Sequence, residues 1–142
     1  MTDVKRANWI PAPAAFNLNM ACIAINKAFD NDGYGCYLVG SALTKRDYRD
    51  VDVRFILSDD GWSRLFGTDS PDRPDLHPRW SVMCASISTW LQSQTGLPID
   101  FQFQQATAAN AEFSRQTGHH REPLGMFTHP NPRDYAAALA TE

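Results

Sequence analysis

The stretch DVDVRFIL, residues 50–57, decides the fold of this chain. Its apolar residues alternate with polar ones, as they do in a β-strand that buries one face. The polar positions Asp50, Asp52 and Arg54 then share the opposite face. We therefore expect a half-buried strand that packs on a core with one face and presents two carboxylates on the other.

Two other segments supply groups that such a pair of carboxylates can work with. Gly40-Ser41 precedes the pair by ten residues, and Asp100 lies in a later strand with the same alternation. Hard divalent cations prefer carboxylate oxygens, and a third acid from a neighbouring strand completes a site begun by Asp50 and Asp52. Glycine lets the backbone approach a phosphate, and the serine hydroxyl adds a donor. The sequence thus predicts metal ligands beside a phosphate-binding turn.

Basic residues crowd around the Asp-x-Asp pair although the chain as a whole is acidic. They are Lys45, Arg46, Arg49 and Arg54, in a chain with a formal charge of −3 and a pI near 5.7. We expect Arg49 and Arg54 either to contact phosphate or to form ion pairs with the aspartates. Lys45 and Arg46 are expected to be solvated. The net charge excludes a general attraction to nucleic acid, so a long polynucleotide is not the expected partner.

The bulk composition fits one globular domain over residues 1–142, since 43% of the residues are hydrophobic. The three cysteines, Cys22, Cys36 and Cys84, are widely spaced in apolar stretches, which predicts buried free thiols of a reducing compartment. The charged N-terminus lacks a long apolar segment, so neither a signal peptide nor a membrane span is expected. These features predict a cytoplasmic protein.

The rest of the sequence is predicted to be scaffold in three parts: an extended N-terminal arm over residues 1–15, a core over 16–104, and C-terminal helices and loops over 105–142. Apolar spacing predicts helices over 16–30, 58–66, 80–91 and 107–117, and a short one beginning at Pro132. Strands are predicted over 36–39, 51–57 and 99–104, and a loop over the proline-rich residues 67–79. His119 and His120 follow a glycine and are expected in a loop without a metal or acid-base role.

Asp-x-Asp pairs also occur in two other classes of enzyme. In phosphohydrolases of the haloacid dehalogenase type, the nucleophilic aspartate ends an apolar strand, whereas here the apolar run follows the pair. Glycosyltransferases use Asp-x-Asp to hold a metal and a nucleotide sugar, but their domains are usually much longer and need no upstream Gly-Ser. The first alternative is excluded by the order of the residues, and the second is weaker.

Three segments together resemble a known family. They are Leu38-Val39-Gly40-Ser41, Arg49-Asp50-Val51-Asp52-Val53 and Pro98-Ile99-Asp100-Phe101. In this order they look like a minimal form of the DNA polymerase beta-type nucleotidyltransferase superfamily, over roughly residues 16–104. The resemblance implies an α+β (α/β) fold with a mixed, mostly antiparallel small sheet flanked by helices.

The same resemblance implies a reaction and a role for each site residue. Asp50 and Asp52 would bind two Mg²⁺ or Mn²⁺ ions, and Asp100 would bind the catalytic metal and help to deprotonate the acceptor hydroxyl. Gly40 and Ser41 would bind the nucleoside triphosphate. The expected activity is transfer of a nucleoside monophosphate from the triphosphate to a hydroxyl group.

The sequence leaves the acceptor open, because the large C-terminal domain with which many relatives hold an acceptor is not evident. Protein, RNA and small molecules all stay candidates. A second hypothesis is a catalytically inactive module of the same fold that binds a nucleotide or a partner protein, in the manner of an antitoxin. The complete acid triad favours the enzyme.

Overall fold

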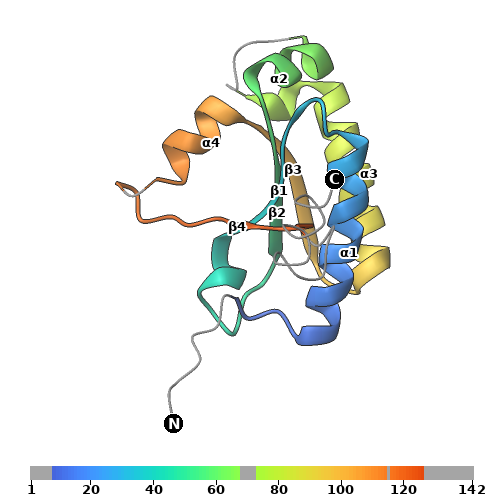
Figure 1. Cartoon of the computed structure of the whole chain (residues 1–142), viewed down its shortest axis with the longest axis vertical. Helices are drawn as coiled ribbons and strands as arrows, with labels where there is room; N and C mark the ends of the chain where they lie inside the picture. The colour runs from blue at the N-terminus through green and yellow to red at the C-terminus, as the bar shows by residue number, and fades with distance from the viewer. Residues whose placement is uncertain (1–7, 68–72, 115, 127–142) are drawn as a thin grey trace, which may run out of the picture.

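The computed structural model describes residues 8–67, 73–114 and 116–126. Within them the chain forms a mixed sheet with helices on both faces, an α+β fold, as the sequence predicts (Figure 1). The helices are α1 (Ala12–Ala28), α2 (Asp59–Phe66), α3 (Pro78–Thr95) and α4 (Ala106–Glu112), with short 3₁₀ helices η1 (Gly40–Leu43) and η2 (Pro74–Leu76). The strands are β1 (Gly33–Val39), β2 (Val51–Leu57), β3 (Ile99–Gln105) and β4 (Glu122–Pro123).

The sheet has the strand order β3-β2-β1-β4. β1 pairs antiparallel with β2 and with β4, while β2 pairs in parallel with β3. Because the β2–β3 register is regular, Asp52 lies opposite Asp100 and Arg54 lies opposite Gln102. Residues that are 48 positions apart in the sequence, Asp52 and Asp100, are therefore neighbours in the sheet.

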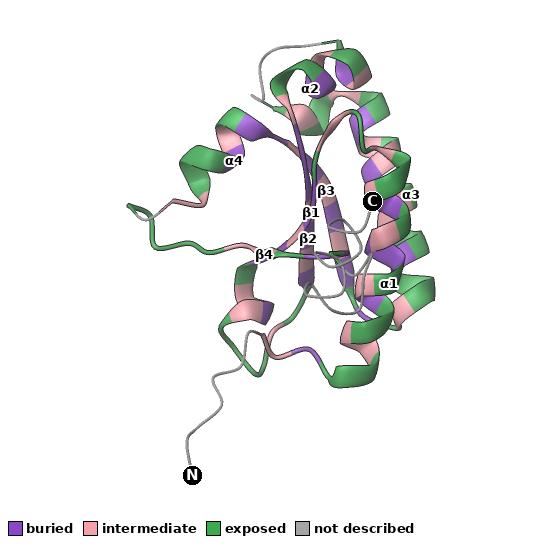
Figure 2. Cartoon of the chain, viewed as in Figure 1, coloured by how far each residue is buried: buried purple, intermediate pink, exposed green. Residues whose placement is uncertain are grey.

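The core lies between the sheet and the helices α1 and α3, which cover one face together (Figures 1 and 2). The alternating apolar residues of β2 and β3 are buried there, including Val51, Val53 and Phe55. The rings of Phe55, Phe101 and Phe103 meet in edge-on contacts at the centre. η1 and α4 lie on the other side of the sheet, so the polar face of β2 and β3 is left for the site.

Side chains of α3 cover the outer edge of β3. Gln92 donates to the Ile99 carbonyl, and Trp80 donates from its indole to the Phe103 carbonyl, both at 3.0 Å. Between them Ser88 accepts the Phe101 N–H at 2.8 Å and donates to the Phe101 carbonyl, while the Cys84 sulfur accepts the Phe103 N–H. These four residues recur every four positions, so they form one stripe of the helix. The stripe satisfies backbone groups that would otherwise be open to another strand.

The N-terminal prediction needs correction. α1 begins at Ala12 rather than at residue 16, so the predicted arm over 1–15 is helical at its end. Two prolines misled the prediction, yet a proline in the first helical turn is tolerated because its missing N–H has no partner there. Residues 1–7 lie outside the described residues.

Other boundaries also differ from prediction. The predicted loop over 67–79 contains η2 and the start of α3 at Pro78, while residues 68–72 lie outside the described part. α4 ends at Glu112 rather than near residue 117, because the Thr117 hydroxyl folds back and donates to the Glu112 carbonyl at 2.6 Å. β4 was not predicted, and the helix predicted from Pro132 lies outside the described residues.

Two predictions from composition concern the cysteines and membrane-spanning segments. All three cysteines are buried and unpaired, as expected. Burial and the neighbouring Cys22 thiol raise the pKa of Cys36 well above its ordinary value, so this thiol stays protonated at neutral pH. Among the described residues, no helix combines the length and the apolar character that crossing a membrane requires.

Candidate functional site

Asp52 and Asp100 form the centre of the polar face. Their side chains are 23% and 45% exposed, so both remain open to solvent on the side of the sheet away from α1 and α3. The parallel pairing of β2 and β3 brings the two carboxylates together, as the sequence predicts. This pair of acids is the part of the expected triad that the structure assembles most clearly.

Asp50 is placed differently from the other two acids. It lies one residue before β2, is exposed, and does not line the pocket described below, although its charge still acts on Asp52. In the described part of the chain, no three His, Cys, Asp or Glu side chains are grouped so that they could hold a metal ion. Asp50 is therefore adjacent to the pair formed by Asp52 and Asp100 rather than part of a preassembled cluster.

Arg54 supplies a positive charge beside both carboxylates. Its Nη2 lies 3.9 Å from Asp52 Oδ1 and 3.8 Å from Asp100 Oδ2. Its Nη1 donates to the backbone carbonyls of Val53 and Asp100 at 3.1 and 2.9 Å. The guanidinium is thus fixed by backbone carbonyls. The Asp100 carboxylate has a second neighbour, since its Oδ1 accepts a hydrogen bond from the Gln102 amide at 3.4 Å. Of the two roles expected for Arg54, the structure shows the ion pair.

The Asp52 carboxylate is electrostatically unfavourable in the fold. Burial is the largest cause that raises the pKa of Asp52, and the negative charges of Asp100 and Asp50 raise it further. Arg54 acts in the opposite direction, but the net pKa shift is upward. A second cation near Asp52 and Asp100 would relieve this repulsion, because an opposite charge favours the ionised form.

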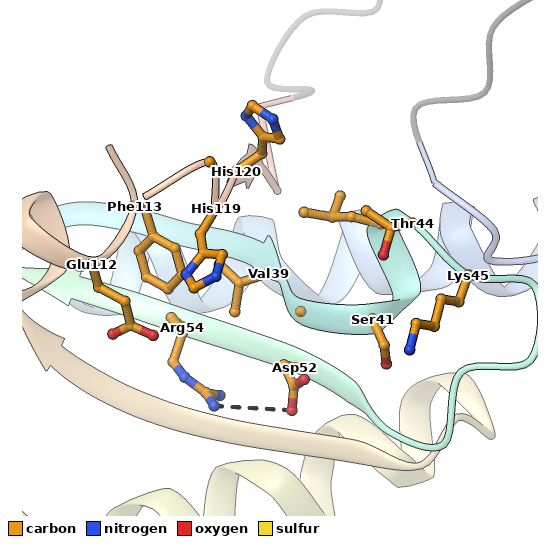
Figure 3. Close-up of a pocket in the computed structure, with 13 residues that line it drawn as sticks. Val39, Ser41, Thr44, Lys45, Asp52, Arg54, Glu112, Phe113, His119 and His120 are labelled. Atoms are coloured by element: carbon orange, nitrogen blue, oxygen red, sulfur yellow. Dashed lines mark ion pairs between the residues drawn. The ribbon is translucent and has the colours of Figure 1, made fainter. Parts of the chain in front are cut away.

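The Gly40-Ser41 turn closes one side of the site. Gly40 has φ = +78°, and a Cβ atom built on it would overlap the carboxylate oxygen Oδ2 of Asp52. Glycine is needed at this position for both reasons. The turn continues as η1, in which the Ser41 carbonyl accepts the N–H groups of Thr44 and Lys45 at 3.0 and 2.8 Å. Ser41 is thereby held next to the Asp52 carboxylate (Figure 3).

A pocket of about 440 Å³ opens over this turn and over β2 (Figure 3). Of the two paired acids, Asp52 lines it, while Asp100 lies outside the lining on β3. Asp52 and Arg54 lie in its floor, Ser41 and Lys45 lie toward one end, and Glu112, Phe113 and His119 lie toward the other. The complete lining is Val39, Gly40, Ser41, Leu43, Thr44, Lys45, Asp52, Arg54, Glu112, Phe113, Gly118, His119 and His120.

Several lining residues were not predicted as site residues. Lys45 was expected to be solvated; it is exposed, but it also lines the pocket. The loop predicted for His119 and His120 is confirmed, yet both histidines reach the pocket. They do so because the chain after α4 returns across the sheet to form β4 beside β1. No local sequence spacing signals such a return.

Arg49 was expected either to contact phosphate or to form an ion pair with the aspartates. It is exposed and does not line the pocket. It lies in the segment between η1 and β2, whereas Lys45 follows directly on η1. Lys45 and Arg54, rather than Arg49, are therefore the basic side chains that line the pocket with Gly40 and Ser41.

Comparisons of the chain with family models, with curated proteins and with solved structures found no match. A function is therefore inferred from the side-chain groups at the site. Asp52, Asp100 and Ser41 offer hard oxygen ligands, which suit Mg²⁺ or Mn²⁺. Lys45 and the start of η1 offer a cation and a hydroxyl, which suit phosphate. These residues fit a metal-bound polyphosphate.

Proposed function

We propose that this protein is a metal-dependent nucleotidyltransferase that uses a nucleoside triphosphate and Mg²⁺ or Mn²⁺. The observation that carries the proposal is the pairing of Asp52 with Asp100, with the Asp52 carboxylate packed directly against the glycine of the Gly40-Ser41 turn. Asp52 and Asp100 would hold the metal, with Asp50 as a third ligand from the segment before β2. Gly40, Ser41 and Lys45 would bind the triphosphate.

The reaction that this arrangement serves is an in-line displacement at the α-phosphorus. The oxygen of an acceptor hydroxyl forms a bond to that phosphorus, and the bond from it to the bridging oxygen of pyrophosphate breaks. The hydroxyl proton passes to the Asp100 carboxylate and then to solvent, and pyrophosphate leaves. When bound, the metal supplies charge stabilisation at the reacting oxygens. The acceptor is a hydroxyl of a protein, an RNA or a small molecule.

The electrostatics of the site support this proposal. The net upward shift in the pKa of Asp52 means that its charge is poorly compensated in the fold. Ionisable groups with shifted pKa values concentrate at functional sites. An aspartate with a purely structural role is expected where its charge is stabilised. The overall acidic charge also fits a small nucleotide better than a polynucleotide. We expect the protein in the cytoplasm, where nucleoside triphosphates are available.

Binding of a triphosphate with and without metal tests the proposal. Calorimetry should show binding of ATP or GTP only in the presence of Mg²⁺ or Mn²⁺. Asp52→Asn should weaken it by about 100-fold or more, because loss of a group that merely orients a metal ligand already costs 10- to 100-fold. Asp47→Asn is the matched control, since Asp47 is exposed and outside the pocket lining. Equal binding by the Asp52 variant would refute the metal assignment.

A second candidate function is favoured by Arg54. Its guanidinium already lies within 4 Å of both carboxylates, so the pair is partly neutralised by the protein itself. A module of this kind can bind a nucleotide or a partner protein without turnover. Triphosphate labelled at the α-phosphate and incubated with cell extract separates the two functions. A transferred label that disappears with Asp100→Asn supports the enzyme, and nucleotide binding without any transferred label supports the binding module.

A further inference from the structure

The two ends of the pocket differ in chemistry. At one end the η1 turn presents Ser41 and the ammonium group of Lys45, while Asp52 and Arg54 lie in the floor between the ends (Figure 3). At the other end Phe113 projects into the pocket next to Glu112 and His119 (Figure 3). This end is aromatic and carries an acceptor, whereas the η1 end suits anions.

A nucleoside triphosphate has the same order of groups along its length. Its polyphosphate would contact Ser41 and Lys45, and its α-phosphate would lie over Asp52, the member of the acid pair that lines the pocket. Its base then reaches Phe113 and His119, whose rings suit stacking on any base. The pocket is continuous at about 440 Å³, so one ligand can contact both ends. The aromatic end is thus better suited to the base of the donor nucleotide than to a second anion.

Glu112 is the residue at this end that can distinguish one base from another. Its Oε2 accepts a hydrogen bond from the Gln104 amide at 2.7 Å, which fixes the carboxylate at the C-terminus of α4. The other oxygen, Oε1, has no such bond to Gln104, and an ionised carboxylate offers only acceptors. Guanine presents two adjacent donors, its ring N–H and its exocyclic amine. Adenine and cytosine present one amine beside an acceptor, and uracil presents one N–H between two acceptors.

We propose that the end of the pocket formed by Glu112, Phe113 and His119 binds the nucleobase, and that Glu112 selects guanine. The inference rests on the proposed function, since it assumes that a nucleoside triphosphate is the ligand. It adds a specificity-determining residue that lies outside the Gly-Ser and Asp-x-Asp segments. The base most strongly rejected is uracil, because its two carbonyl oxygens face the carboxylate.

The test is a comparison of the four ribonucleoside triphosphates by calorimetry in Mg²⁺, with the full chain and with Glu112→Gln. The unmodified protein should bind GTP about tenfold or more tightly than UTP, the ratio that one charge-assisted hydrogen bond produces. Glu112→Gln should remove that preference, because its amide offers a donor as well as an acceptor. Glu112 is exposed, so the substitution leaves the core intact. Asp60→Asn, an equal change of charge on α2 away from the pocket, should keep the GTP preference.

The outcomes separate the inference from the proposed function. Metal-dependent binding of all four nucleotides with equal affinity refutes the selection by Glu112 and leaves the nucleotidyltransferase proposal standing. A GTP preference that persists in Glu112→Gln refutes the role of this residue. Absence of binding to every triphosphate in both Mg²⁺ and Mn²⁺ refutes the proposed function and the inference together. Phe113→Leu gives a second check, since loss of stacking should weaken GTP and ATP alike.

Discussion

At the scale of single residues, ionised Asp52 destabilises the fold, and the same carboxylate is the proposed metal ligand. Its folded-state pKa lies above the ordinary value of 3.8, because burial and two acidic neighbours outweigh the help of Arg54. Ionisation of Asp52 is therefore less favourable in the folded chain than in the unfolded chain. By linkage, its contribution to stability is fully present below pH 3.8 and is lost as the pH rises through the folded-state pKa.

Because ionisation of Asp52 destabilises the fold, Asp52→Asn should change the stability in a pH-dependent way. At pH 7 the variant should have a higher free energy of unfolding than the unmodified protein, because the unfavourable charge is gone. The difference should vanish toward pH 3, where Asp52 is protonated in both states. Chemical denaturation across this pH range measures it, with the exposed Asp47→Asn as the control. A variant less stable than the parent at pH 7 would mean that the carboxylate serves the fold through Arg54.

Gly40 offers a second prediction at this scale, because its Cβ would meet the movable end of a side chain rather than the backbone. Gly40→Ala incurs the cost of a positive φ, about 1–2 kcal/mol, and also displaces the Asp52 carboxylate. Gly96→Ala is the matched control: Gly96 has φ = +72°, and a Cβ there would have no atom within 4 Å.

Both glycine variants should lose stability in a denaturant titration, since both place alanine at positive φ, and Gly40→Ala should lose at least as much as Gly96→Ala because it also displaces the Asp52 carboxylate. Only Gly40→Ala should lose metal-dependent triphosphate binding. If both variants bind the triphosphate equally well, the close approach of Gly40 to Asp52 has no functional importance.

At the scale of secondary-structure elements, side chains of α3 bond to backbone groups of β3 that a further strand would otherwise pair with. Ser88 is the centre of this arrangement, since it both accepts from and donates to the backbone of Phe101. Ser88→Ala leaves two partly buried backbone groups without partners, which should cost about 1–3 kcal/mol of unfolding free energy.

Ser93→Ala is the control for this prediction on the same helix. Ser93 is exposed, and its hydroxyl donates to the Trp90 carbonyl within α3, so its loss should cost about 0.5 kcal/mol or less. Hydrogen exchange of the Phe101 amide should accelerate in Ser88→Ala and stay unchanged in Ser93→Ala. Equal stabilities would show that the edge of β3 does not depend on this serine.

The same elements show what the sequence can and cannot predict. The faces of β2 and β3 are local properties of a two-residue period, so the sequence alone identifies Asp52, Asp100 and Arg54 as polar-face residues. The return of the chain to form β4 depends on pairing with a strand some 85 residues earlier, Tyr37 with Pro123 for instance. Local patterns carry no such information. The pocket wall formed by His119 and His120 was therefore missed, although their loop was predicted.

At the scale of the whole molecule, the two faces of the sheet differ in what they carry. The helix-covered face holds the core, and the other face carries the polar side chains of β2 and β3 with η1 and α4 beside them (Figure 1). The pocket on this face carries charges of both signs, since Lys45 and Arg54 line it together with Asp52 and Glu112. An anionic ligand that brings its own metal would complete the charge balance at Asp52 and Asp100.

Metal binding by the acid pair can be observed by anomalous diffraction from crystals soaked with Mn²⁺ and a non-hydrolysable GTP analogue. We expect a manganese peak about 2.0–2.3 Å from carboxylate oxygens of both Asp52 and Asp100, with the triphosphate against Gly40 and Ser41. We also expect the Asp50 side chain to turn toward the metal. A manganese ion elsewhere, or a triphosphate bound away from the Gly40-Ser41 turn, would contradict the proposed function.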